Sequence, residues 1–328
     1  FKPDTIIALG GGSSMDAAKA MWIFYEHPEV NFDDLKQKFM DIRKRAFKYP
    51  ELGRKSKLIC IPTTSGTGSE LSPLTTISDR ANGRKYPLTD YSLTPSIAIV
   101  DPEFTTNLPA KSTAETGMDV LTHAIEAYTS VMASDYTDGL ALEAIKLVFA
   151  YLPRAVKNGK NDLFAREKMH NAATIAGMAF ANAFLGLVHS LAHKIGAEYH
   201  LVHGRTCAIL LPHVIRYNGS VPTKLAVWPK YEEYQCDKKY LDICKMLGLK
   251  AETPEEATNV LADAVMALGK DVGIDMNFQS LVPDEKLWES NLEKIAYLAY
   301  EDQCTPANPR EPLVREMEQI MRDAYKGN

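Results

Sequence analysis

Two kinds of hydrophobic pattern divide the chain. Near its start, apolar and β-branched residues gather in short runs at 5–9, 57–61 and 96–100, which predict buried strands. From about residue 112 on, apolar residues recur with helical spacing. The helices predicted there span residues 113–130, 134–151, 165–185, 187–196, 205–217, 238–247, 254–272, 283–301 and 311–325. The pattern predicts an α/β domain with a parallel sheet over residues 1–110 and an all-helical domain over residues 111–328.

Loops of small polar residues follow the first two predicted strands. The first reads GGGS (residues 10–13) and leads into a helix predicted at 17–26, and the second reads TTSGTGSE (residues 63–70). Glycines let a phosphate approach the backbone, and the free N–H groups of a helix N-terminus favour an anion. The spacing is not G-x-G-x-x-G, and an ordinary polar turn explains either loop alone. Two such loops at the carboxyl ends of strands favour a dinucleotide.

The helical part carries a cluster of acidic and imidazole side chains. Asp119 and His123 are four residues apart, as are His189 and His193, and His203 follows. This spacing places each pair on one helix face. One carboxylate with several imidazoles suits a divalent metal such as Fe(II), Zn(II), Co(II) or Ni(II). A salt link or a satisfied core pair explains one such pair, whereas two pairs in otherwise apolar helices favour a metal, because burying unpartnered imidazoles is costly.

Composition limits the classes of function. The chain has 328 residues, which suits two domains, and 45% of them are hydrophobic, as in ordinary globular proteins. A net charge of −5 gives no general basic surface for nucleic acid, and no apolar run is long enough to span a membrane. The five cysteines show no paired spacing and are interpreted as reduced thiols of a cytoplasmic protein.

Several motifs together resemble one known family. They are residues 10–13 with Asp16, residues 63–70, residues 117–128, and residues 186–193 followed by His203-Gly204. In this order they resemble the iron-containing (group III) alcohol dehydrogenases. Residues 85–88 and 172–186 are similar to the alcohol dehydrogenase half of the bifunctional aldehyde–alcohol dehydrogenases. The resemblance extends over essentially the whole chain.

The resemblance implies a set of site residues and cofactors. The implied metal ligands are Asp119, His123, His189 and His203, with His193 as a catalytic residue near the nicotinamide and substrate. The positions that match cofactor contacts are Gly11, Gly12, Ser13, Asp16, Thr63, Thr64, Thr67 and Lys85. The implied cofactors are NAD(H) and Fe(II), with Zn(II) as a possible substitute. The family's α/β domain has a further strand and helix before the first loop, so we expect a truncated domain here.

These expectations define a function and its alternatives. The resemblance implies a metal-dependent alcohol dehydrogenase that reduces a short-chain aldehyde reversibly with NADH, acetaldehyde to ethanol in the simplest case. It also implies part of a bifunctional aldehyde–alcohol dehydrogenase and a cytoplasmic homo-oligomer, with a helical filament possible in the full-length protein. Partners other than the small substrate, such as nucleic acid or a membrane, are not expected. The alternatives are a glycerol-dehydrogenase-like polyol oxidoreductase and a role mainly in filament assembly.

Overall fold

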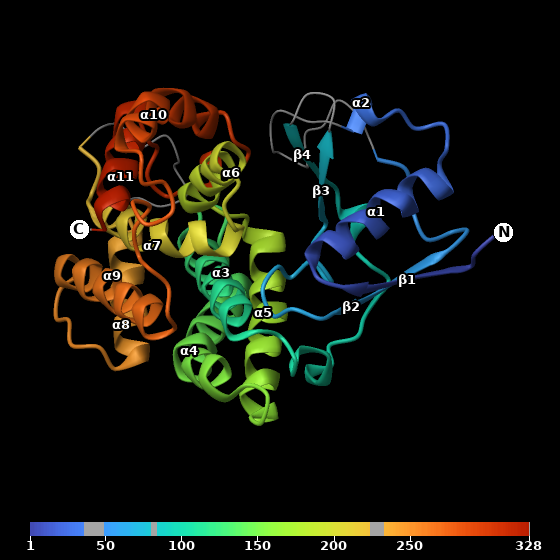
Figure 1. The fold of residues 1–328 in the computed structure, drawn as a ribbon, viewed down its shortest axis with the longest axis horizontal. Helices are drawn as coiled ribbons and strands as arrows, with labels where there is room; N and C mark the ends of the chain where they lie inside the picture. Colours follow the sequence, from blue (N-terminus) through green and yellow to red (C-terminus); the bar gives the residue numbers. More distant parts are fainter. Residues whose placement is uncertain (36–48, 80–83, 224–232, 328) are drawn as a thin grey trace.

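The N-terminal part is built on a small parallel sheet. The structure, a computed structural model, describes residues 1–35, 49–79, 84–223 and 233–327 (Figure 1). The elements of this part are β1 (Thr5–Gly10), α1 (Gly12–Glu26), α2 (Phe32–Leu35), β2 (Lys57–Pro62), β3 (Leu74–Asp79), β4 (Arg84–Thr89) and β5 (Ile97–Ala98). Strands β1, β2 and β5 pair in parallel, as predicted, and their order is β1-β2-β5. Strands β3 and β4 form a separate antiparallel pair.

Alternation along the strands sets the two faces of the sheet. Ala8 of β1 lies opposite Cys60 of β2, and both are buried beneath Met15 of α1. Successive strand residues point to opposite faces, so Ile7 and Leu9 lie on the other face, where they are exposed. Helix α1 therefore covers one face of the sheet. Strand β1 leads through the first glycine loop directly into the N-terminus of this helix.

The C-terminal part is helical, as predicted. Its helices are α3 (Ala110–Thr129), α4 (Asp135–Asn158), α5 (Leu163–Ala183), α6 (Leu187–Tyr199), α7 (His203–Gly219), α8 (Cys236–Leu247), α9 (Pro254–Asp271), α10 (Glu285–Tyr300) and α11 (Val314–Lys326). Short 3-10 turns lie at Tyr91–Leu93, Pro102–Thr105 and Thr305–Ala307. Two helices of the site begin earlier than predicted: α1 begins at Gly12 and not at residue 17, and α7 begins at His203 and not at residue 205.

Helix α3 is the centre of the helical part. It packs against α4, α5 and α7, and nearly all of its residues from Thr113 on are buried (Figure 1). A helix buried on all sides is normally apolar, yet α3 carries Asp119, His123 and Glu126 into the core. These polar side chains therefore need partners from the surrounding helices.

The two parts meet along α5. Figure 1 shows α5 on the side of the helical part that faces the sheet, and the Pro102–Thr105 turn packs against this helix. The change from strands to helices falls between β5 and α3, and the division into domains at residue 110 stays a prediction. Within the described ranges, no single helix has the length and apolar character to cross a membrane, although α5 and α6 pass that test jointly as a pair bent by 105°.

Candidate metal and cofactor site

Three helices bring the predicted metal ligands together. Asp119 projects from the middle of α3, His189 from the first turn of α6, and His203 is the first residue of α7. His203 Nε2 lies 3.5 Å from Asp119 Oδ1, and His189 Nε2 lies 3.9 Å from the same oxygen. Asp119 and His189 are buried, whereas the side chain of His203 is 42% exposed, so the group is reached from the His203 side.

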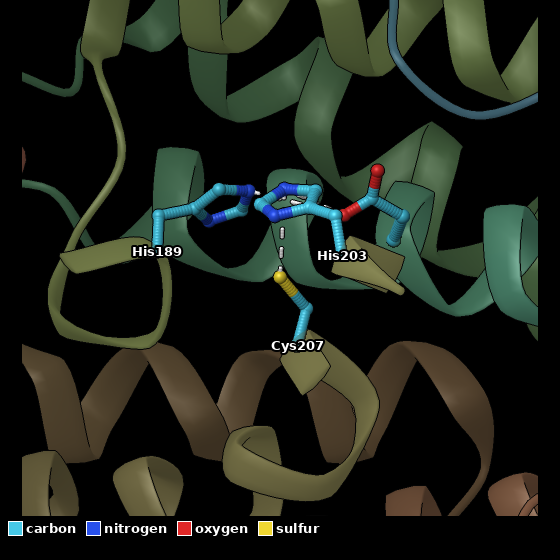
Figure 2. Close-up of side chains that lie close together, drawn as sticks. His189, His203 and Cys207 are labelled. Carbon is cyan, nitrogen blue, oxygen red and sulfur yellow. Dashed lines mark hydrogen bonds and ion pairs between the residues drawn. The ribbon is translucent and has the colours of Figure 1, made fainter. Parts of the chain in front are cut away.

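A thiol completes this group. Cys207 Sγ lies 3.7 Å from His203 Nε2, and Figure 2 shows the thiol pointing at the imidazole from one turn further along α7. The ligand atoms of Asp119, His189, His203 and Cys207 all lie within 4.8 Å of one another. Cys207 was not among the predicted site residues.

His123 lies beside this group of ligand atoms. Its ring stacks on that of His189 with 4.7 Å between centroids, and on its other side it packs against Phe180 at 4.6 Å. The side chain is buried, and its Nδ1 has no hydrogen-bond partner among the residues that the structure describes. The structure thus places His123 next to the other three predicted ligands, and its role as a ligand stays a prediction.

The chemistry of the group fits a divalent metal. Asp119 Oδ1 and His189 Nε2 are buried and lack hydrogen-bond partners within the described part of the chain. Burial raises the pKa of Asp119, lowers that of His123 to about 3 and holds that of His189 well below its usual value. The two imidazoles are therefore neutral, the form that binds metals. A bound cation offsets the cost of burying these unpartnered atoms.

Glu126 fixes the orientation of His189. Its Oε2 lies 2.5 Å from His189 Nδ1, and its Oε1 accepts a hydrogen bond of 2.6 Å from the backbone N–H of Val188. Burial raises the pKa of Glu126 to about 7, against the lowering effect of its backbone donors. A carboxylate that accepts from Nδ1 places the lone pair of the ring on Nε2, which faces Asp119. Sequence reasoning missed this residue.

We expect Glu126→Gln to weaken metal binding by about 10–100-fold, the usual cost of losing such an outer partner. The glutamine amide has almost the same shape, but it lacks the charge that favours the required tautomer of His189. Chelator competition measures the affinity. Glu115→Gln is the control, because Glu115 is a buried acid of the same helix that pairs with Arg205. Equal losses in both variants would contradict a specific role for Glu126.

His193 lies at the open edge of the group. Its ring stacks on that of His203, with 5.5 Å between centroids and 13° between planes, and its side chain is 35% exposed. Its Nδ1 lies 3.2 Å from Asp302 Oδ2, which also accepts from Lys194 Nζ at 2.7 Å. Burial acts to raise the pKa of Asp302, but His193 and Lys194 hold it well below the usual range. The ionised carboxylate thereby orients the His193 ring.

Gly204 sets the distance between α7 and α3. A Cβ placed on Gly204 would lie 2.2 Å from the backbone oxygen of Glu115 and 3.2 Å from Asp119 Cβ. Because the closest atom belongs to the backbone, a larger residue would separate the two helices that carry Asp119 and His203.

We expect Gly204→Ala to lower the free energy of unfolding by about 1–3 kcal/mol, as overpacking does, and to weaken metal binding as well. Thermal unfolding with and without metal measures both effects. Gly139→Ala is the matched control, because a Cβ on this α4 glycine meets nothing within 4 Å and alanine favours a helix by about 1 kcal/mol. Wild-type behaviour of both variants would show that this close approach does not control the site.

Most of the predicted cofactor residues lie in two adjoining loops, whereas Asp16 lies within α1 and Lys85 in β4. Gly11 precedes the first turn of α1, which contains Gly12 and Ser13, and the Thr63 N–H donates to the Gly10 carbonyl. A Cβ on Gly12 would lie 2.8 Å from Thr67 Cγ2, so a larger residue here would require the Thr67 side chain to shift. Thr64 lies similarly against Gly11, and Lys85 lies in β4 opposite Ser78. The exposed N-terminus of α1 is suited to a phosphate.

A buried lysine of α1 holds the end of the second loop. Lys19 Nζ donates to the carbonyls of Ser72 and Leu74, both at 2.7 Å, and lies 3.3 Å from Ser69 Oγ. The Ser69 hydroxyl donates in turn to Asp16 at 3.2 Å. Burial lowers the pKa of Lys19 to about 8 and raises that of Asp16. The position of Asp16, a predicted cofactor contact, therefore depends on this network, which sequence reasoning missed.

The second loop also rests on the helical part. Ser65 Oγ lies 2.9 Å from His170 Nδ1, and the Thr174 hydroxyl donates to Glu70 at 2.8 Å. Both partners belong to α5. Phe180, two turns further along α5, packs against His123. The cofactor loop and the metal-binding group therefore share one supporting helix.

This fold and site are those of a known family. The chain matches the model of iron-containing alcohol dehydrogenases over residues 1–102 and that of the Fe-containing alcohol dehydrogenase family, C-terminal, over residues 113–325. The chain belongs to the family of iron-containing alcohol dehydrogenases. This confirms the family that the sequence motifs resemble.

Individual relatives agree with this assignment. An aldehyde-alcohol dehydrogenase of Streptococcus pneumoniae is 66% identical over 327 residues, and the chain spans 37% of the length of that relative. The structure of an iron-containing alcohol dehydrogenase from Thermococcus thioreducens is similar over 99% of this chain and 78% of its own, with 35% identity and a TM-score of 0.86. A sulfoacetaldehyde reductase from Bifidobacterium kashiwanohense, solved with NAD⁺, is similar over 99% and 77%, with 28% identity and a TM-score of 0.80.

Proposed function

We propose that the chain catalyses the reversible reduction of a short-chain aldehyde by NADH, with acetaldehyde and ethanol as the simplest pair. The observation that carries this proposal is the convergence of Asp119, His189 and His203 on one point, beside a helix that also supports the cofactor loop. A buried metal-binding group next to a dinucleotide loop suits hydride transfer at a polarised carbonyl.

Different residues of the chain hold the metal and the dinucleotide. We propose that Asp119, His189 and His203, with His123 as predicted, hold the metal, and that the glycine and threonine loops hold NAD(H). When bound, the metal supplies Lewis acidity toward the substrate oxygen. Glu126 keeps His189 Nε2 available, and the backbone N–H groups at the start of α1 bind the dinucleotide phosphates.

His193 is placed to handle the proton of the alcohol. Its partly exposed ring lies beside His203 and is oriented through Nδ1 by Asp302. We propose that Nε2 gives a proton to the forming alkoxide in reduction and takes it back in oxidation, with exchange to solvent on the exposed side.

Metal reconstitution tests the proposal. The metal-free chain is loaded anaerobically with Fe(II) or Zn(II), and oxidation of NADH and of NADPH is followed with aldehydes of increasing length. We expect turnover only in the metal-loaded protein, preference for NADH, and the highest kcat/KM with short aldehydes. Glycerol oxidation in place of aldehyde reduction would favour the polyol alternative, and tight metal binding without turnover would overturn the enzymatic proposal.

The place of this chain in a longer enzyme and its assembly are also proposed. Because relatives of this sequence include a longer aldehyde-alcohol dehydrogenase, we propose that the chain forms the alcohol dehydrogenase part of such a bifunctional cytoplasmic enzyme. We propose further that it assembles as a homo-oligomer, with a filament in the full-length protein. Light scattering of this chain and of a longer one distinguishes a monomer, a closed oligomer and an open filament.

A further inference from the structure

The loop of residues 302–308, between α10 and α11, connects the three helices that carry the predicted metal ligands. We call it the tail loop. The N–H of Val131, directly after the C-cap of α3, donates to the Ala307 carbonyl of this loop at 3.0 Å. The Asn308 side chain pairs with that of Asn218 in the last turn of α7, with bonds of 2.8 and 3.1 Å. The contacts of the tail loop with the third helix, α6, are more extensive.

Three buried side chains of the tail loop contact α6. Asn308 Oδ1 accepts from the N–H of Leu187, the first residue of the helix, at 3.1 Å. The Thr305 hydroxyl lies 2.8 Å from that of Ser190, nearly one turn further along. Asp302 bonds to the following turn through the contacts described above. Residues three and four apart share one face of a helix, so the tail loop holds one face of α6 over its first two turns.

The start of α6 is capped from outside the helix. The first N–H groups of a helix lack partners within it, and the N-cap residue here, Gly186, makes no capping bond with a side chain. Instead, the N–H of Leu187 donates to Asn308 and that of Val188 donates to Glu126. A Cβ on Gly186 would lie 2.8 Å from Asn308 Oδ1 and 3.1 Å from Glu126 Oε1. A larger residue at this position would therefore displace the two side chains that cap the helix.

We infer that Asn308 is a positioning residue, because it caps α6 from the tail loop and so fixes where His189 and His193 lie relative to α3 and α7. Its own orientation is set by two donated bonds, one to the Asn218 side chain and one, at 2.7 Å, to the Arg310 carbonyl. The consequence for metal binding rests on the proposed function, in which His189 holds the metal. The cap itself does not depend on a metal, since it consists of hydrogen bonds within the chain.

Hydrogen exchange of the metal-free chain tests the cap without an activity assay. The variants Asn308→Ala and Asn218→Ala both break the amide pair, but in Asn218→Ala the Asn308 amide keeps its bonds to Leu187 and Arg310. We expect the first amides of α6 to exchange about 2–30-fold faster in Asn308→Ala, which is the equivalent of the usual cost of losing an N-cap. In Asn218→Ala we expect the wild-type rate. Mass spectrometry of peptides within residues 184–195 measures this exchange, with peptides of α4 as the internal reference.

Metal affinity tests the consequence of the cap. Chelator competition with Zn(II) is expected to show an affinity about tenfold lower in Asn308→Ala, the low end of what the loss of an outer partner costs, and wild-type affinity in Asn218→Ala. Equal exchange at the start of α6 in both variants, or wild-type metal affinity in Asn308→Ala, would overturn the inference.

The outcomes separate this inference from the proposed function. Absence of metal binding in the wild type would count against the proposed function, and hydrogen exchange then decides the inference by itself. If Asn308→Ala does not fold, exchange of the Leu187 amide in the wild type decides, because this amide has no partner within its helix. Protection of the amide supports the cap, and exchange at the rate of an unstructured peptide contradicts it.

Discussion

Asp119→Asn is expected to leave the chain folded and to lower its metal affinity by at least about a hundredfold, the upper end of what the loss of an outer partner costs. Asp119 is the carboxylate shared by His189 and His203, and its contacting oxygen is fully buried. Asparagine has nearly the same volume but carries no charge to hold a cation. Aldehyde reduction is expected to fall in parallel with metal content.

Metal analysis after dialysis and chelator competition measure the loss. Asp263→Asn is the control, because Asp263 is an exposed acid on α9 that pairs with Arg216. Circular dichroism checks that both variants fold. Wild-type metal affinity in Asp119→Asn would show that this carboxylate is not a donor and that the group serves only to stabilise the core.

Lys19→Met is expected to lower the free energy of unfolding by about 3–5 kcal/mol, the range found when one partner is removed from a buried charged pair. Methionine has a similar length, but it leaves the carbonyls of Ser72 and Leu74 without their donor and Asp16 without its neighbouring cation. The loop that carries Ser69 then loses its support, so NADH affinity is also expected to decrease.

Urea unfolding and NADH fluorescence titration measure the two effects. Lys57→Met is the control, because the ammonium of Lys57 is exposed and donates to the Gly53 carbonyl, at the surface. If Lys19→Met unfolds like the wild type, the network around Lys19 does not support the loops. If it loses stability but binds NADH normally, the network acts only on the fold.

The fold was predictable because its signals are local. Short β-branched runs indicated the strands of the parallel sheet, and the helical period indicated each long helix after residue 110. The start of α7 was placed late, because no capping residue precedes His203 and the side chain of Val202 makes no capping bond. Helix spacing alone does not reveal such a boundary.

The site was only partly predictable. The spacing of four residues paired Asp119 with His123, and applied to His203 it would also have indicated Cys207. Spacing places a side chain on a helix face but not at a depth, so it could not show that Cys207 Sγ lies within 4.8 Å of the ligand atoms of Asp119, His189 and His203. The role of Glu126 could not be predicted for another reason. Its partner His189 lies 63 positions away in the sequence, and the two side chains meet because α6 packs on α3.

The predicted metal ligands come from three separate helices, and this has a thermodynamic consequence. An ion that joins α3, α6 and α7 acts as a cross-link of the helical part, and it stabilises the folded state by about 2.7 kcal/mol when its free concentration is a hundred times its Kd. The melting temperature of the chain therefore becomes a measure of metal supply. When metal is scarce, the buried polar atoms of Asp119 and His189 have no cation to offset the cost of their burial. Local opening and proteolysis are then expected to begin where α3, α6 and α7 meet.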